Sequence, residues 1–225
     1  MIEAVVFDLD GVLIETEELW DEVRERLAAE RGGRYDAEAQ RAMMGMSSLE
    51  WSRYMHDELG LPEPPEEISA EVVRRMVGRY RERLPLLPGA VQAVRRLAAR
   101  WPLAVASSSN RELIDTALSL SGLAPCFRAT ASSEEVPRGK PAPDVYVEAA
   151  RRVGVAPDSC AAIEDSHSGI RSAKAAGMRV VAIPNRTFPP DQEALGLADV
   201  VLRSIAELTA DVVEGRGDSP REVRK

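Results

Sequence analysis

The sequence predicts an α/β fold in which a doubly wound parallel sheet carries an inserted helical cap. Short apolar runs that end in small or polar residues alternate with stretches of helical periodicity. This alternation is typical of a parallel sheet with helices on both faces. Residues 15–85 interrupt it, because they contain helical patterns and no credible strand. We therefore expect a core formed by residues 1–14 and 86–225 and a cap formed by residues 15–85.

The expected strands are short and rich in β-branched or small apolar residues. They lie at residues 4–9, 103–106, 128–131, 160–163, 180–183 and 199–202. Helical periodicity fills the intervals between them at 88–100, 111–121, 142–153 and 168–176. In the cap, glycine and proline separate helices expected at 17–31, 36–44, 48–59 and 67–83. The cap methionines, Met44 among them, are expected in the cap core, and the polar residues from 214 onward are expected to fray.

Composition and charge exclude several classes of protein. The 225 residues carry a formal net charge of -8, whereas general nucleic-acid binders present a basic surface. No apolar run approaches the ~20 residues that cross a bilayer, and the first residues enter a strand at once, which leaves no room for a signal peptide. Cys126 and Cys160 are too few for a disulfide framework. We expect a cytoplasmic protein without nucleic-acid or membrane partners, either a monomer or a weak homodimer.

The first candidate for chemistry is Asp8-Leu9-Asp10-Gly11, at the carboxyl end of the first expected strand. Alternation along a strand places Asp8 and Asp10 on the same side. Two such carboxylates repel each other unless a cation or a shared proton compensates them, and Mg²⁺, a hard ion that prefers oxygen ligands, would do so. Taken alone, the tetrapeptide fits a plain Asp-Gly turn equally well.

The second candidate is the run Ser107-Ser108-Ser109-Asn110, which joins the end of a strand to the start of a helix. Free backbone amides at a helix start favour an anion, and the serine hydroxyls add donors. The same residue types cap helices in many proteins. Without further context, this run fits a helix cap better than a phosphate site.

Two more charged clusters are Lys140-Pro141, in a loop, and Glu164-Asp165, at the end of a strand. Only three of the 29 basic residues are lysines, which makes Lys140 a candidate for a role that arginine cannot serve. A lysine beside carboxylates would neutralise them and hold a phosphate oxygen. Each cluster alone fits a solvated loop or a charged turn. Together, four such clusters at one carboxyl edge of a parallel sheet indicate a ligand site.

The segments DLDGVLIETE, VASSSN, GKPAPDVY and AIEDSHSGIRSAKAAG resemble, in this order, the four signature motifs of the haloacid dehalogenase-like hydrolase superfamily. The resemblance implies a Rossmann-like core, a Mg²⁺ cofactor and an aspartyl-phosphate intermediate. It implies the following catalytic residues: Asp8 as nucleophile, Asp10 as general acid and base, Ser107 and Lys140. It further implies phosphate binding by Ser107, Ser108 and Lys140, and metal binding by Asp8, Asp10 through its carbonyl, Glu164 and Asp165.

The cap would select the substrate of such a protein. The chain resembles β-phosphoglucomutase and the hexitol and 2-deoxyglucose 6-phosphate phosphatases, but Trp20 and Ser48 stand where the mutase cycle needs a histidine and an arginine. The predicted function is thus Mg²⁺-dependent hydrolysis of a small phosphorylated metabolite, a sugar or polyol phosphate. A phosphosugar mutase and a non-catalytic binding protein are the alternatives.

Expected substrate contacts in the cap are Glu17, Trp20, Ser47 and Ser48. An indole can stack on the apolar face of a sugar, although Trp20 fits simple packing between cap helices equally well. Most of the many cap arginines are expected to form a solvated face. The Lys140–Pro141 peptide bond is expected to be cis, because the lysine must turn sharply into the site.

Overall fold

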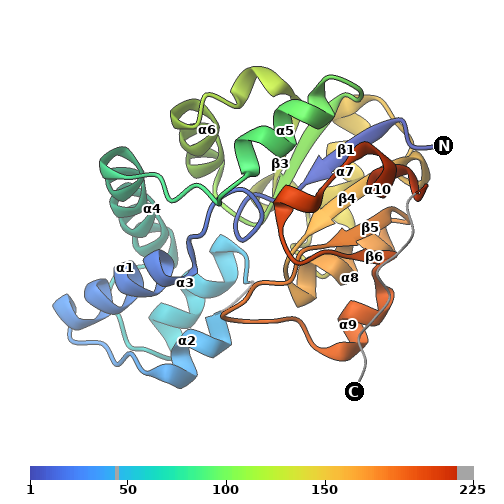
Figure 1. Ribbon diagram of the computed structural model, residues 1–225. Coiled ribbons are helices and arrows are strands. Elements are labelled where there is room, and N and C mark those ends of the chain that lie inside the picture. Colours follow the sequence, from blue (N-terminus) through green and yellow to red (C-terminus); the bar gives the residue numbers. More distant parts are fainter. Residues whose placement is uncertain (44–45, 217–225) are drawn as a thin grey trace.

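The computed structural model describes residues 1–43 and 46–216 and contains a six-stranded parallel sheet with helices on both faces (Figure 1). The strands are β1 (Ala4–Phe7), β2 (Leu103–Ser107), β3 (Phe127–Ser132), β4 (Cys160–Glu164), β5 (Arg179–Ala182) and β6 (Val200–Val201). They pair in the order β3-β2-β1-β4-β5-β6. The chain order reverses between β1 and β4, which is where doubly wound sheets bind ligands, at the carboxyl ends of the strands.

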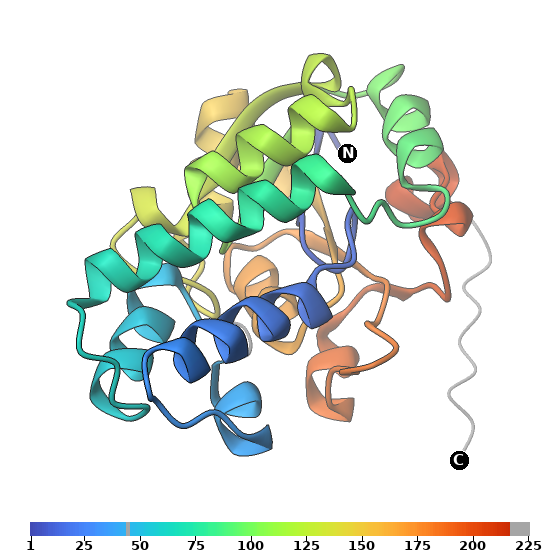
Figure 2. The same cartoon turned by 90° about the vertical axis from the view of Figure 1, so that its left-hand side faces the viewer.

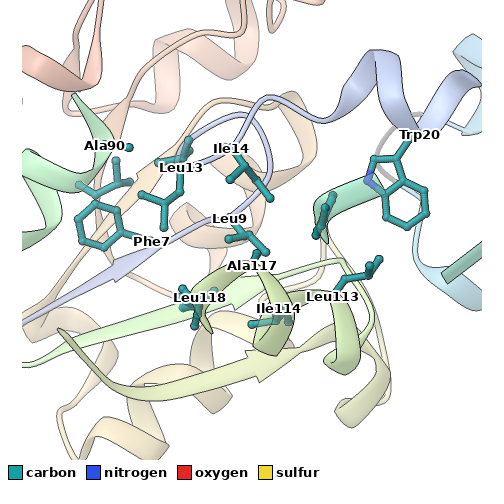
Figure 3. Packing of buried hydrophobic residues seen from close by; sticks show 14 of the residues in the cluster. Phe7, Leu9, Leu13, Ile14, Trp20, Ala90, Leu113, Ile114, Ala117 and Leu118 are labelled. Atoms are coloured by element: carbon teal, nitrogen blue, oxygen red, sulfur yellow. The ribbon is translucent and has the colours of Figure 1, made fainter. Parts of the chain in front are cut away.

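The core helices are α5 (Ala90–Ala98), α6 (Arg111–Leu120), α7 (Asp144–Val153), α8 (His167–Ala175), α9 (Gln192–Leu197) and α10 (Ala210–Glu214). Alternation along β1 explains their two layers. Val5 and Phe7 belong to the apolar cluster that includes α5 and α6 (Figure 3), whereas Ala4 and Val6 belong to the cluster with α7 and α8. Because β1 is buried on both faces, its sequence reads as a continuous apolar run.

Four helices separate β1 from the remainder of the core: α1 (Glu17–Glu30), α2 (Ala37–Met43), α3 (Ser48–Asp57) and α4 (Pro65–Glu82). Figure 1 shows them grouped beside the sheet, and α4 contacts both α1 and α3. Proline at the first position of α4 is favourable, since its missing N–H would be unpaired there in any case. α4 also runs alongside α6 (Figure 2), so that the four helices α1–α4 are held against the part of the chain that contains the sheet.

The predicted fold class is confirmed by the parallel sheet and its two helical layers. The helices α9 and α10, of six and five residues, were not predicted, because so short a helix gives almost no periodic signal. The Lys140–Pro141 bond is cis, as expected. Met44, which also ends the helix expected at 36–44, and the polar tail beyond Arg216 lie outside the described residues. No helix within the described part is long and apolar enough to cross a membrane.

Candidate active site

The carboxyl end of β1 presents Asp8 and Asp10 in a tight turn. The backbone N–H of Leu9 donates to Asp8 Oδ1 over 2.7 Å, which fixes one oxygen of that carboxylate. Gly11 has a φ of 76° and packs so closely that a Cβ on it would overlap the Asp165 carboxylate. Only glycine combines this backbone conformation with the missing side chain, so Gly11 lets the ends of β1 and β4 approach each other.

Lys140 joins the ends of these two strands. Its Nζ lies 2.8 Å from Asp8 Oδ2 and 2.6 Å from Glu164 Oε1, and its side chain is only 2% exposed. Burial alone would lower the pKa of Lys140, but the charges of the two carboxylates outweigh burial and raise it. Burial raises the pKa of Asp8 well above its usual value, and Lys140 offsets only part of this effect. The ammonium is therefore a fixed cation against Asp8.

The Glu164 carboxylate is enclosed by donors. Its Oε1 accepts from Lys140 and from the Tyr146 hydroxyl, at 2.6 and 2.8 Å. Its Oε2 accepts from the backbone N–H of Asp165 and from the N–H and hydroxyl of Ser166. Burial would raise the pKa of Glu164, but the nearby Lys140 ammonium holds it below the usual value. Glu164 thus stays ionised and positions Lys140.

Three buried carboxylates in this place fit a divalent cation. Asp8, Glu164 and Asp165 each offer an oxygen, and these oxygens lie within 4.8 Å of one another. Oδ1 of Asp165 is buried and accepts no hydrogen bond from any described residue. Burial, followed by the charges of Glu164 and Asp8, raises the pKa of Asp165 well above its usual value. One ammonium cannot neutralise three carboxylates, so the donor set suits a hard ion such as Mg²⁺. Because Glu164 already has its donors, Asp8 and Asp165 are the freer oxygen ligands.

Asp10 is held by hydroxyl groups. Thr16 Oγ1 donates to Asp10 Oδ1 over 2.5 Å, and Ser109 Oγ donates to Oδ2 over 2.7 Å. Ser107 Oγ lies 3.4 Å from the same Oδ2 and accepts from the backbone N–H of Ser109, which sets the turn after β2. Ser107 itself is fully buried, whereas Ser108 lines the cavity above the sheet edge. The site thus gathers side chains from the ends of β1, β2 and β4 and from the loop after β3.

A cavity of about 500 Å³ lies between this sheet edge and the cap helices. Asp8, Asp10, Lys140 and Asp165 line it from the core, and Glu17 and Trp20 line it from α1. Burial, followed by the nearby charge of Asp10, raises the pKa of Glu17 to about 7. The site residues predicted in the sheet-bearing part are therefore brought together, and Glu17 and Trp20 of α1 line the same cavity opposite them.

Ser47 and Ser48 lie elsewhere, along a second cavity between cap and core. The Ser47 hydroxyl and backbone N–H both donate to the Glu50 carboxylate, which fixes the start of α3. The Ser48 hydroxyl is buried and donates to Asn110 Oδ1 over 2.8 Å. Ser47 therefore stabilises the first turn of a cap helix, and Ser48 links that helix to the core.

Comparison with known families matches residues 2–177 to the hydrolase family described as haloacid dehalogenase-like hydrolase. The chain belongs to the haloacid dehalogenase-like hydrolases. It is 34% identical to hexitol phosphatase B of Escherichia coli strain K12 over 216 residues, which cover 93% of this chain and 95% of that protein. It is 31% identical to the bifunctional riboflavin kinase/FMN phosphatase of Arabidopsis thaliana, with 91% of this chain matched but only 54% of that longer protein spanned. The crystal structure of CbbY from Rhodobacter sphaeroides in complex with phosphate has a TM-score of 0.85 at 30% identity, covering 95% of this chain and 100% of that one.

Membership of the haloacid dehalogenase-like hydrolases confirms the family that the four motifs predicted. Sequence reasoning missed three residues of the site in this chain, Thr16, Arg24 and Tyr146, and gave Ser109 no contact with Asp10. Arg24 is an exception among the cap arginines, because it lines the cavity instead of belonging to a solvated face. A signal was present, since Arg24 follows Glu17 by seven residues and so lies on the same face of a helix.

Proposed function

We propose that this hydrolase is a Mg²⁺-dependent phosphatase that acts on a small sugar or polyol phosphate through an aspartyl-phosphate at Asp8. The observation that carries the proposal is the setting of Asp8. Its carboxylate is held by the Leu9 N–H and the Lys140 ammonium, and it lines a cavity together with Asp10 and Asp165. A buried, immobilised carboxylate with a fixed cation beside it suits in-line attack on phosphorus.

In the first step, an Asp8 oxygen attacks the phosphorus and the ester oxygen leaves. Asp10, protonated, donates its proton to that leaving oxygen, so that a neutral alcohol departs and an acyl phosphate remains on Asp8. The hydroxyls of Thr16 and Ser109 fix the Asp10 carboxyl group for this transfer. Lys140 offsets negative charge on the transferring phosphoryl oxygens.

In the second step, Asp10 takes a proton from water, and the resulting hydroxide attacks the phosphorus of the acyl phosphate. The P–O bond to Asp8 breaks, which releases inorganic phosphate and restores both carboxyl groups. Asp8, Asp165 and the carbonyl of Asp10 would hold Mg²⁺, and Glu164 would complete the negative environment. When bound, the ion supplies Lewis-acid stabilisation of the phosphoryl oxygens.

Two observations support a sugar or polyol phosphate. The cavity, of about 500 Å³, has the size of a small-metabolite site. Hexitol phosphatase B, which resembles this chain over nearly its whole length, carries the substrate class in its name. The residues at the two positions that the mutase cycle needs, Trp20 and Ser48, have no imidazole or guanidinium, and the Ser48 hydroxyl is engaged by Asn110.

The test is hydrolysis of p-nitrophenyl phosphate and of a panel of sugar and polyol phosphates with Mg²⁺. We expect Asp8→Asn to lose activity by about a thousandfold or more, as removal of a nucleophile does. Asp115→Asn is the matched control, because Asp115 is an exposed aspartate on α6. If Asp8→Asn retained full activity, the covalent mechanism would be wrong. Isomerised sugar phosphate exceeding free phosphate would identify a mutase instead, and an absence of turnover on the whole panel would favour the non-catalytic alternative.

A further inference from the structure

Arg24 of α1 lies between two tryptophans at the cap side of the active-site cavity. Its guanidinium carbon is 4.7 Å from the centre of the Trp20 ring and 4.8 Å from that of Trp51. The two indoles are themselves in contact, with ring centres 5.9 Å apart. Both tryptophans are buried, so that they hold the guanidinium in place as a stacked cation. Trp20 is thereby committed to Arg24 and Trp51 and is less available to stack on a sugar.

The guanidinium forms no ion pair within residues 1–43 and 46–216, although the charge of Glu17, which lines the same cavity, acts on it. Its Nε is buried and makes no hydrogen bond there, and no carboxylate of those residues forms an ion pair with it. The acidic residue one turn earlier, Asp21, accepts a hydrogen bond from the Tyr35 hydroxyl over 2.6 Å. Burial lowers the pKa of Arg24 to about 10, which still leaves it charged at neutral pH.

A stacked guanidinium keeps its N–H groups free in the plane of the ring system, where they match the paired oxygens of a carboxylate or a phosphate. Arg24 lines the same cavity as Asp8 and Lys140. A substrate whose reacting phosphate lies at Asp8 therefore extends toward α1. On that side, the cavity is lined by two arginines, Arg24 and Arg41, and one carboxylate, Glu17.

From this placement we infer that the substrate carries a second anionic group, distal to the phosphate that is cleaved, and that Arg24 binds it. The inference rests on the proposed phosphatase function and narrows its substrate class to acidic sugar or polyol phosphates, either phosphorylated sugar acids or bisphosphates. An uncharged distal hydroxyl would leave the stacked guanidinium, whose Nε makes no hydrogen bond within the described residues, without an ion-pair partner.

The experiment compares substrates of equal length that differ only at the distal carbon. 6-Phosphogluconate ends in a carboxylate and glucitol 6-phosphate ends in a hydroxymethyl group. We expect kcat/KM for the acid to exceed that for the polyol by about tenfold or more, the effect of one charged hydrogen-bonded pair. Fructose 1,6-bisphosphate against fructose 6-phosphate is the parallel comparison for a distal phosphate, and it shows which acidic group is preferred.

Arg24→Met should bring both ratios to about one. In Arg26→Met, both ratios and kcat/KM for p-nitrophenyl phosphate, which has no second anionic group, should stay within about threefold of the wild-type values. Arg26→Met is the matched control on α1, since Arg26 is largely exposed and pairs only with Glu30. A wild-type preference of one or below for both acidic substrates would overturn the inference. An undiminished preference in Arg24→Met, with the far-UV circular dichroism and melting temperature of the wild type, would do the same.

Failure of the phosphatase function would look different. If the wild type hydrolyses none of these esters, calorimetry with the Asp8→Asn variant measures binding of 6-phosphogluconate and glucitol 6-phosphate directly. Tighter binding of the acid that is lost on adding Arg24→Met would support the Arg24 site even without turnover. Equal binding of the two compounds would exclude it.

Discussion

Replacing Lys140 by methionine should destabilise the protein far more than the same change at Lys174. The Lys140 ammonium lies within 2.8 Å of both Asp8 and Glu164, and all three side chains are at most 9% exposed. Removing it leaves two buried carboxylates without their cation, a loss of about 3–5 kcal/mol. Lys174 forms one ion pair with Asp199 in which both side chains are more than 30% exposed. Its loss should therefore cost less than about 1 kcal/mol.

Urea unfolding followed by circular dichroism, in a buffer with EDTA, measures both losses. The deficit of Lys140→Met should also depend on pH. Without the ammonium, the folded-state pKa of Asp8 rises further above its unfolded value, and burial raises the pKa of Glu164, which Lys140 had held below its usual value. The variant therefore binds extra protons when folded. Its stability is then greatest below the unfolded pKa values and falls as the pH rises through the folded ones. Equal losses at the two lysines, or a deficit that does not grow between acidic and neutral pH, would refute the buried ion-pair account.

Three further outcomes follow from the site. Gly169→Ala should destabilise the protein by about 1–3 kcal/mol in urea unfolding. The added alanine Cβ would overlap the Glu164 carboxylate, which five hydrogen bonds hold in place. Unchanged stability would contradict the rigid setting of Glu164. The pKa of Glu17 is raised to about 7, and its ionised form repels a substrate with an anionic tail. For such a substrate, kcat/KM of the wild type should therefore be higher below pH 7 than above it. Glu17→Gln should remove this inflection from the pH profile. Mg²⁺ at about a hundred times its Kd should stabilise the wild type by about 2.7 kcal/mol but Asp165→Asn much less, and equal stabilisation of both would exclude Asp165 as a ligand.

The core of the site could be predicted because a parallel sheet brings distant motifs to one edge. Asp8, Lys140 and Asp165 are far apart in the sequence, but Asp8 and Asp165 directly follow β1 and β4, and Lys140 lies in the loop between β3 and α7. Few roles other than ligand binding explain several charged side chains at one edge of a parallel sheet, and this identifies the three residues. Tyr146 could not be found in this way, because its spacing on α7 fits an ordinary core residue and only the register of that helix brings its hydroxyl to Glu164.

Choices among neighbouring residues also lay beyond the sequence. Three serines in a row begin at the last residue of β2, and only the turn geometry decides that Ser109, more closely than Ser107, contacts Asp10. In the cap, Arg24 was one of many arginines with helical spacing. Its role depends on the packing of α1 against Trp51 of α3, a contact between helices that periodicity within one helix does not contain.

The most direct test of the central claim, that Asp8 forms the acyl phosphate, is chemical trapping during turnover. The enzyme is mixed with Mg²⁺ and a hydrolysed phosphomonoester, quenched, and treated with borohydride, which reduces an acyl phosphate to an alcohol. Peptide mass spectrometry then shows which carboxyl group had been phosphorylated. We predict reduction of Asp8 to homoserine, dependent on substrate and absent when Asp10 or another carboxylate is examined. Reduction at a different residue, or none during sustained turnover, would contradict the account.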